Sequence, residues 1–154
     1  MMKVSKKAEY ALKALIELAV SYERGDSVTL INDVAKRTAI PKKYLEQILL
    51  GLKNNGILVA RRGIGGGYSL NRPPEDITVG QIIMAVEGPL SPLNCVSDGR
   101  HVNCPEESSC GIYSLMIDVR NAVSGVLDNI TLKELTKRTK DLADAKNNIP
   151  SYTI

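Results

Sequence analysis

The feature that most constrains this chain is residues 41–70, where a helical pattern leads through a short turn into a glycine-rich hairpin pattern. Pro41 suits the first turn of this helix, and the polar run at 54–56 ends it. A first strand near 57–59 and a returning strand at 68–70 then flank the glycines. The expected apolar helix face consists of Tyr44, Leu45, Ile48, Leu49 and Leu52.

A helix followed by a glycine-tipped hairpin is typical of the second half of a winged helix-turn-helix. In that arrangement the polar helix face lies in the major groove of DNA, and hairpin arginines reach phosphates or the minor groove. Arg61 and Arg62 precede the tip, whose glycines permit positive φ angles. The alternative is an ordinary hairpin after an amphipathic helix with solvated side chains. The residues off the apolar face are Lys42, Lys43, Glu46, Gln47 and Lys53.

Two further helices are expected ahead of this stretch. Residues 6–22 carry a regular apolar face, with Ser5 as the N-cap. A short helix at 30–38 is joined to the next helix by a tight connection at 38–41. Two short helices joined by about four residues form a helix-turn-helix.

Charge divides the 154 residues into two unlike halves. Residues 1–74 hold 13 Lys and Arg against 6 Asp and Glu, a net charge of +7, whereas residues 75–154 hold 7 against 11, a net charge of −4. A basic first half is what a phosphate-binding module needs. We therefore expect a winged helix-turn-helix region at 1–74, a second segment at 75–139 and a flexible tail at 140–154.

The second segment is expected to be helical around an irregular loop. Thr78 caps a helix at 79–87, and a long apolar helix runs from about 109 to 129. Because that helix is too apolar for a solitary surface element, we expect it to pack against a partner subunit. A short helix at 132–138 follows. The expected fold is mainly α-helical with a small β-hairpin and a long C-terminal dimerisation helix.

The sequence also indicates where the protein resides and what it does not do. No signal peptide is visible, and no apolar run approaches the roughly 20 residues that span a bilayer, so a cytoplasmic protein without a membrane partner is expected. The glycine-rich segment precedes no helix that could hold a phosphate. No acid–base pair stands at a defined spacing, so we expect neither an enzyme nor a small-molecule substrate.

Three cysteines, Cys95, Cys104 and Cys110, have the spacing C-x8-C-x5-C within a polar loop. An odd number of cysteines in a reducing compartment argues against a disulfide framework. Thiolates select zinc, copper(I) or an iron–sulfur cluster. A fourth ligand position remains, for which the candidates are His101 in the loop, Tyr113 on the following helix and Glu9 from the other subunit of a dimer.

Several motifs together resemble one family, the Rrf2 bacterial transcription regulators, over about residues 2–139. That family includes iron–sulfur cluster regulators, a nitric-oxide sensor, an iron regulator and a cysteine regulator. Beside the cysteine loop, the motifs are Lys7 with Tyr10-Ala11-Leu12, Tyr44-Leu45-Glu46-Gln47, Lys53-Asn54-Asn55-Gly56, Arg62-Gly-x-Gly-Gly-Gly-Tyr68, Val86-Glu87-Gly88-Pro89 and Asn129-Ile-Thr131-Leu.

The resemblance implies a homodimer, crossed through the long helix, that binds a palindromic operator in double-stranded DNA. Carried over by position, Arg62 enters the minor groove. Lys43, Tyr44, Glu46 and Gln47 then face the major groove, and the expected DNA-contacting set is completed by Lys42, Arg61 and Gly63.

The resemblance also implies that the three cysteines hold an iron–sulfur cluster, with [2Fe–2S] favoured over [4Fe–4S]; a sample prepared in air can lack it. Tyr113 stands where the family's iron–sulfur regulators place a histidine ligand. Glu9 matches an acidic ligand that another branch takes from the partner's first helix, and it is the preferred fourth ligand.

The expected function is therefore a transcriptional repressor whose operator binding responds to iron, redox or nitric-oxide status through the cluster. Two alternatives stay open. One is a zinc-stabilised structural or protein-interaction module without a DNA role. The other is a DNA-binding regulator that holds no cluster and senses through its thiols.

Overall fold

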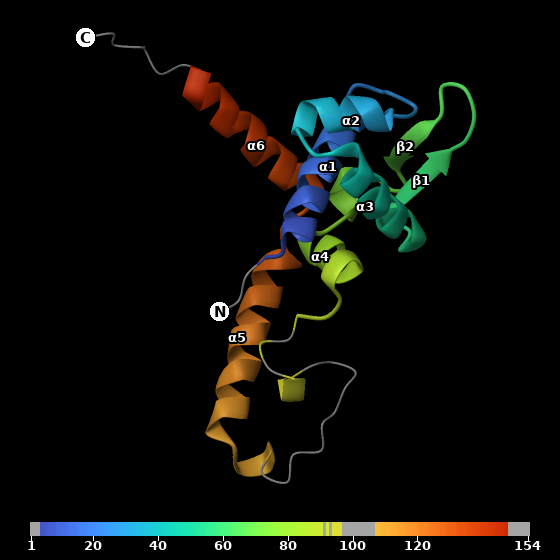
Figure 1. Cartoon of the computed structure of the whole chain (residues 1–154). Helices are drawn as coiled ribbons and strands as arrows, with labels where there is room; N and C mark the ends of the chain where they lie inside the picture. The colour runs from blue at the N-terminus through green and yellow to red at the C-terminus, as the bar shows by residue number, and fades with distance from the viewer. Residues whose placement is uncertain (1–3, 91, 93, 97–106, 148–154) are drawn as a thin grey trace.

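The computed structural model describes residues 4–90, 92, 94–96 and 107–147 (Figure 1). His101 and Cys104 lie outside these residues. The described elements are mainly helices with one two-stranded antiparallel hairpin, which confirms the expected fold class. In chain order they are α1 (Lys6–Glu23), α2 (Ile31–Thr38), α3 (Lys42–Asn54), β1 (Leu58–Arg61), β2 (Gly67–Leu70), η1 (Pro74–Asp76), α4 (Val79–Glu87), η2 (Asn94–Val96), η3 (Glu107–Ser109), α5 (Gly111–Leu127) and α6 (Leu132–Asn147).

Helix α1 lies at the centre of the molecule, in contact with α2, α3, α4, α6 and β2. Ser5 caps it, because its Oγ accepts a hydrogen bond from the backbone N–H of Ala8 at 3.1 Å. The buried face of α1 is rich in alanine, which lets neighbouring helices approach closely. The fully buried large side chains of α1 and of the elements packed on it include Leu15, Leu18, Leu45, Leu49, Leu52, Ile77, Ile82 and Leu132.

A short backbone bridge ties the start of α4 to the start of α6. Val79 N–H donates to Ile130 O at 2.9 Å, and Leu132 N–H donates to Ile77 O at 2.7 Å. Thr78 caps α4 in a reciprocal capping box with Gln81. The predicted bounds of this helix, 79–87, and its cap are confirmed.

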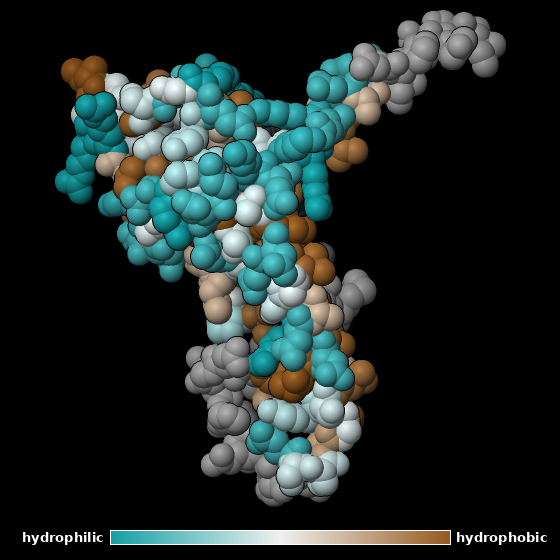
Figure 2. All heavy atoms as spheres, turned by 180° about the vertical axis from the view of Figure 1, so that it is seen from behind, coloured by the Kyte–Doolittle hydropathy of each residue, from teal (hydrophilic) through white to brown (hydrophobic). Residues whose placement is uncertain are grey.

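Helix α5 leaves this bridge and extends away from the other helices as an arm (Figure 1). None of its side chains is buried within the chain, and Ile112, Leu115 and Val126 are more than half exposed. Figure 2 shows hydrophobic atoms along this arm. An apolar helix of 17 residues without a buried face lacks the packing that normally stabilises such a helix.

The C-terminal helix is longer than its sequence pattern suggested. The prediction of a short helix over 132–138 and a loose segment from residue 140 is wrong for residues 140–147, because α6 continues to Asn147. Ion pairs of Lys137 with Asp141 and of Lys140 with Glu23 on α1 lie along the added turns. Within the described ranges, no helix is both long and apolar enough to cross a membrane.

Candidate DNA-binding surface and cysteine site

A left-handed residue makes the turn between α2 and α3. Ala39 has a φ of 54° and is the one described non-glycine residue with a positive φ. Ile40, the next residue, is buried in the core and holds the turn in place. Pro41 is the N-cap of α3 rather than a residue of its first turn, so that prediction is corrected by one position.

The outward face of α3 carries the predicted DNA-contacting residues. Leu45, Ile48, Leu49 and Leu52 are buried as expected, but Tyr44 is 60% exposed, so its assignment to the apolar face is wrong. The core beside α3 is already filled by these four aliphatic side chains. The exposed face consists of Lys42, Lys43, Tyr44, Glu46, Gln47 and also Leu50, an apolar residue that the sequence pattern did not single out.

The hairpin, which we call the wing, pairs Leu58 with Leu70 through to Arg61 with Gly67. The first strand starts one residue later than predicted, at 58, and runs on to 61, whereas the second starts one residue earlier than predicted, at 67. A second pairing attaches the wing to the residue before the N-cap of α2: Thr29 and Tyr68 exchange two backbone hydrogen bonds. Sequence patterns gave no signal for this pairing, because Thr29 is a single residue outside any strand.

Two glycines of the wing are required by close backbone packing. A Cβ on Gly66 would lie 2.3 Å from the carbonyl oxygen of Arg61, and one on Gly67 would lie 2.3 Å from that of Thr29. Gly63 and Gly65 have positive φ angles of 97° and 75°. The glycine-rich segment therefore sets the shape and the attachment of the wing.

Arg61, Arg62 and Gly63 are exposed at the end of the wing. Neither arginine forms an ion pair with any residue that the structure describes, whereas Arg24 pairs with Asp26. A groove of about 410 Å³ lies between the wing, α2 and α3, and its lining includes both arginines, Lys53, Leu30 and Leu50. Exposed guanidinium groups without carboxylate partners are available to phosphates or base edges.

The described cysteines are both half-buried and lie next to α5. Cys95 belongs to η2, which contacts α5. The carbonyl oxygen of Val96 in η2 accepts a hydrogen bond from Arg120 Nη1 on α5 at 2.9 Å, and the Val96 side chain is buried. Cys110 is the N-cap of α5, where its Sγ accepts a hydrogen bond from Tyr113 N–H at 3.4 Å.

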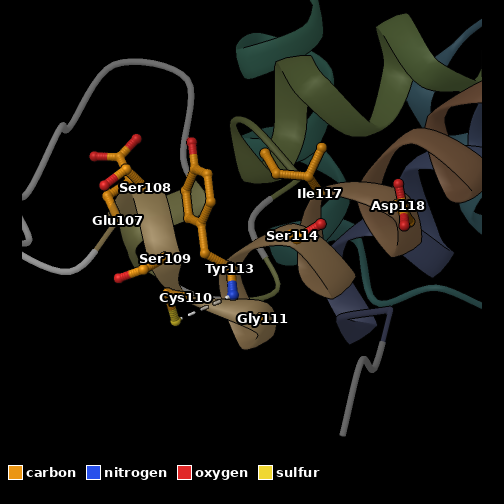
Figure 3. A pocket seen from close by; sticks show the side chains of 9 residues that line it. All are labelled: Glu107, Ser108, Ser109, Cys110, Gly111, Tyr113, Ser114, Ile117 and Asp118. Carbon is orange, nitrogen blue, oxygen red and sulfur yellow. Dashed lines mark hydrogen bonds between the residues drawn. The ribbon is translucent and has the colours of Figure 1, made fainter.

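Tyr113 points away from the Cys110 sulfur, as Figure 3 shows. A hydrogen bond to Glu107, aided by partial desolvation, holds the pKa of the Tyr113 phenol above its usual 10. Glu107, Cys110, Tyr113 and Asp118 are among the residues around an open hollow of about 500 Å³ at this end of α5. The Tyr113 hydroxyl is thus engaged by a carboxylate.

Glu9 lies on the first turn of α1 between two lysines. Its carboxylate is 2.7 Å from both Lys6 Nζ and Lys13 Nζ. The hydrogen bond from Lys13, with that from Lys6, lowers the Glu9 pKa to about 2, so the carboxylate is ionised at neutral pH.

The donor chemistry suits a metal centre, of whose three cysteines Cys104 lies outside the residues described. Cys95 and Cys110 supply thiols, and thiolates are the usual ligands of iron–sulfur clusters. In the part of the chain that the structure covers, no three His, Cys, Asp or Glu side chains lie close enough to hold one metal ion.

A match to the profile of a known protein family decides to which family the chain belongs. The profile of the Rrf2 family, described as "Iron-dependent Transcriptional regulator", matches residues 4–138. The chain belongs to the Rrf2 family. It is a helix-turn-helix transcriptional regulator, and because the family's members are regulators, the expectation that it is not an enzyme is confirmed.

Two Rrf2 relatives have names that describe regulators. The HTH-type transcriptional regulator CymR of Bacillus subtilis is 38% identical over 138 residues, which cover 90% of this chain and 92% of CymR. The HTH-type transcriptional regulator IscR of Cronobacter sakazakii is 32% identical over 149 residues, which cover 96% of this chain and 89% of IscR.

Solved Rrf2 structures agree with the fold. The structure of B. subtilis CymR, called the global cysteine regulator of that organism, superposes with a TM-score of 0.70 at 36% identity, covering 90% of this chain and 98% of CymR. The structure of T. potens IscR superposes with a TM-score of 0.72 at 31% identity, covering 92% of this chain and 90% of IscR. The winged-helix prediction is thereby confirmed.

Proposed function

We propose that this Rrf2 regulator is a homodimeric repressor that binds a palindromic operator in double-stranded DNA and that responds to iron, redox or nitric-oxide status. The observation that carries the DNA-binding part is the position of Arg61 and Arg62, which form no ion pair with the described residues, on a wing attached beside the exposed face of α3. That arrangement suits α3 for the major groove and the wing for the adjacent minor groove.

The proposed DNA contacts divide by role. Arg61 and Arg62, with the backbone of Gly63, approach the minor groove and its phosphates, where guanidinium groups are favoured. The exposed α3 residues contact the major groove, with Glu46 and Gln47 able to hydrogen-bond base edges and Lys42, Lys43 and Tyr44 able to reach phosphates.

The proposed dimer is formed through α5. Its apolar side chains, including Ile112, Leu115 and Val126, are exposed in the single chain, and burial against a second α5 would remove them from water. Two copies related by a twofold axis would present two wings and two α3 helices, which is why a palindromic operator is proposed.

Cys95, Cys104 and Cys110 would hold an iron–sulfur cluster, with Glu9 of the partner subunit as the fourth ligand and [2Fe–2S] favoured over [4Fe–4S]. When bound, such a cluster supplies a centre that reacts with oxidants and nitric oxide. Glu9 is preferred because the resemblance gives an acidic ligand at its position; its ionised carboxylate, which pairs with Lys6 and Lys13 in the single chain, would exchange those partners for the cluster. The hydroxyl of the competing candidate Tyr113 is engaged by Glu107.

The fold offers a path from the cysteines to the DNA-binding surface. Arg120 holds η2, and with it Cys95, to α5. At its other end α5 meets the backbone bridge between the starts of α4 and α6, which pack on α1. A change in the cysteine segment can therefore alter how α5 positions the two DNA-binding regions of the dimer relative to each other. The coupling free energy expected for such switches is about 1–3 kcal/mol.

A second candidate is a regulator that senses through its thiols without a cluster. It is favoured by the similarity to CymR, whose structure is described as that of a global cysteine regulator. The zinc-stabilised module without a DNA role is set aside, because the chain belongs to a family of transcriptional regulators.

Anaerobic purification followed by a visible spectrum and iron, sulfide and zinc analysis separates these candidates. Iron with acid-labile sulfide and a broad visible absorption would support the cluster, and Cys104→Ala should then abolish the colour. A colourless, iron-free protein after attempted reconstitution would refute the cluster and favour the thiol sensor. The DNA-binding part is tested separately, by measuring salt-dependent binding to duplexes selected from a random library.

A further inference from the structure

The tip of the wing carries a large hydrophobic residue in an unusual position. Ile64 lies between Gly63 and Gly65 and is fully exposed, with a relative exposure of 110% against 72% for Leu142, the next most exposed large hydrophobic residue described. An isolated exposed isoleucine contributes nothing to packing within the chain.

The wing presents Ile64 in a defined shape. The turn that carries it is closed by a backbone hydrogen bond from Gly66 N–H to Gly63 O at 3.0 Å, and the flanking Gly63 and Gly65 adopt positive φ angles. Behind the turn, Gly67 lies against the backbone of Thr29, so β2 is attached to the helix-turn-helix. A preorganised tip loses less conformational entropy when it binds.

Positive charge surrounds this apolar tip. Arg61 and Arg62 precede it directly and form no ion pair within the described part of the chain. Figure 2 shows hydrophobic atoms at the outer end of the wing above strongly hydrophilic ones. Arginine is attracted by the narrow, strongly negative minor groove of A·T-rich DNA, so charge directs the tip toward that groove.

We propose that Ile64 enters the minor groove of the operator beside Arg62 and selects A·T over G·C pairs at the position it contacts. This inference rests on the proposed DNA-binding function and adds a residue that determines specificity. A G·C pair places the guanine 2-amino donor on the minor-groove floor, whereas an A·T pair offers only acceptors there. An aliphatic side chain would crowd that amino group and leave its N–H unpaired, which is unfavourable.

The experiment uses the full-length protein and a duplex enriched from a random-sequence library by the wild-type protein. Hydroxyl-radical protection locates the base pairs under the wing. Three duplexes then carry A·T, G·C or inosine·C at those pairs, because inosine·C lacks the minor-groove amino group but keeps the major-groove edge of G·C. Wild-type protein, Ile64→Ala and the control Leu142→Ala, which shortens an exposed aliphatic residue on α6, are compared for affinity.

We expect the wild-type protein and Leu142→Ala to bind the G·C duplex about tenfold more weakly than the A·T duplex and to recover affinity on inosine·C. Ile64→Ala should bind the A·T duplex about fivefold more weakly and discriminate by less than about twofold. If Ile64→Ala keeps the full A·T preference, Arg62 alone carries it and the inference is overturned. If no duplex is enriched at all, the DNA-binding proposal itself is overturned, together with this inference.

Discussion

Thr29 and Tyr68 exchange two backbone hydrogen bonds, from Thr29 N–H to Tyr68 O at 2.8 Å and from Tyr68 N–H to Thr29 O at 2.9 Å. Thr29 is buried, and it directly precedes the N-cap of α2. The wing and the helix-turn-helix therefore form one unit, in which the distance between α3 and the wing arginines is set by backbone pairing.

Replacing Gly67 by alanine should loosen the wing. The added Cβ would lie 2.3 Å from the Thr29 oxygen and 2.8 Å from the Thr29 carbonyl carbon, so β2 has to move away from Thr29. Because overpacking costs about 1–3 kcal/mol, we expect the free energy of unfolding to fall by about that amount in urea denaturation. Affinity for a selected duplex should fall as well.

The matched control for that variant is Gly51→Ala on α3. A Cβ there meets nothing within 4 Å, and alanine favours helix over glycine by about 1 kcal/mol. We expect this variant to be as stable as the wild type or more so. Equal destabilisation by both alanine variants would show that the contact with Thr29 does not support the wing.

Arg62→Ala should weaken DNA binding, and the loss of affinity should be similar for duplexes that differ only outside the base pairs under the wing. Since an arginine that contacts a phosphate releases about one counterion, the slope of log affinity against log salt should become shallower by about 1. Fluorescence anisotropy between about 50 and 200 mM salt measures both effects. Arg138→Ala, on the exposed surface of α6, removes the same charge and should leave the slope unchanged.

Introducing charge on α5 should separate the proposed dimer. Ile112→Glu combined with Leu115→Glu places two carboxylates on side chains that are exposed in the single chain, so the monomer should remain folded. We expect light scattering to report a dimer for the wild type and a monomer for this variant. Leu142→Glu, on an exposed residue of α6, should stay dimeric; a dimeric α5 variant would contradict the α5 interface.

Lowering the pH should destabilise the first turn of α6, because the Glu134 carboxylate becomes protonated. Hydrogen bonds from the backbone N–H and the hydroxyl of Thr131, at 2.8 and 3.1 Å, hold the pKa of Glu134 below its usual 4.5. Because the folded-state pKa is lowered, this contribution to stability is complete above pH 4.5 and is lost as the pH falls below that value.

The corresponding measurement compares Tm values of the wild type and Glu134→Ala at several pH values. The wild type should have the higher Tm at pH 7, and the difference should shrink as the pH falls below 4.5. Asp144→Ala removes an exposed carboxylate that forms no ion pair with any described residue, and it should show no such trend. A Tm difference for Glu134→Ala that is independent of pH would contradict the role of its ionised carboxylate.

Local signals predicted α4 and its cap accurately. Thr78, the apolar spacing after it and the Gly88 that ends the helix all lie within a dozen residues of one another, so no distant contact was needed. Tyr44 shows the opposite case. Its spacing suited the apolar face of α3, but burial depends on which side chains fill the core, and four aliphatic residues of the same helix already do so.

The surroundings of the cysteines could not be predicted from the sequence. The spacing of the three cysteines led to the prediction of thiolate ligands, which stays a prediction, whereas the role of Cys110 as the N-cap of α5 and the hydrogen bond of Tyr113 to Glu107 are properties of the folded chain. Glu9 was a candidate by resemblance, and its two lysine partners follow from helical spacing at i−3 and i+4.

The amino-acid sequence was thus sufficient for those features that depend on near neighbours: the helix-turn-helix order, the glycine-tipped hairpin, the basic first half and the family. Features that join distant residues came from the tertiary structure. These include the pairing of Thr29 with Tyr68, the bridge between the starts of α4 and α6, and the extension of α6 along α1 through Lys140 and Glu23. The reason is physical: periodicity and capping act within a few residues, whereas backbone pairing and burial depend on what the remainder of the chain brings alongside.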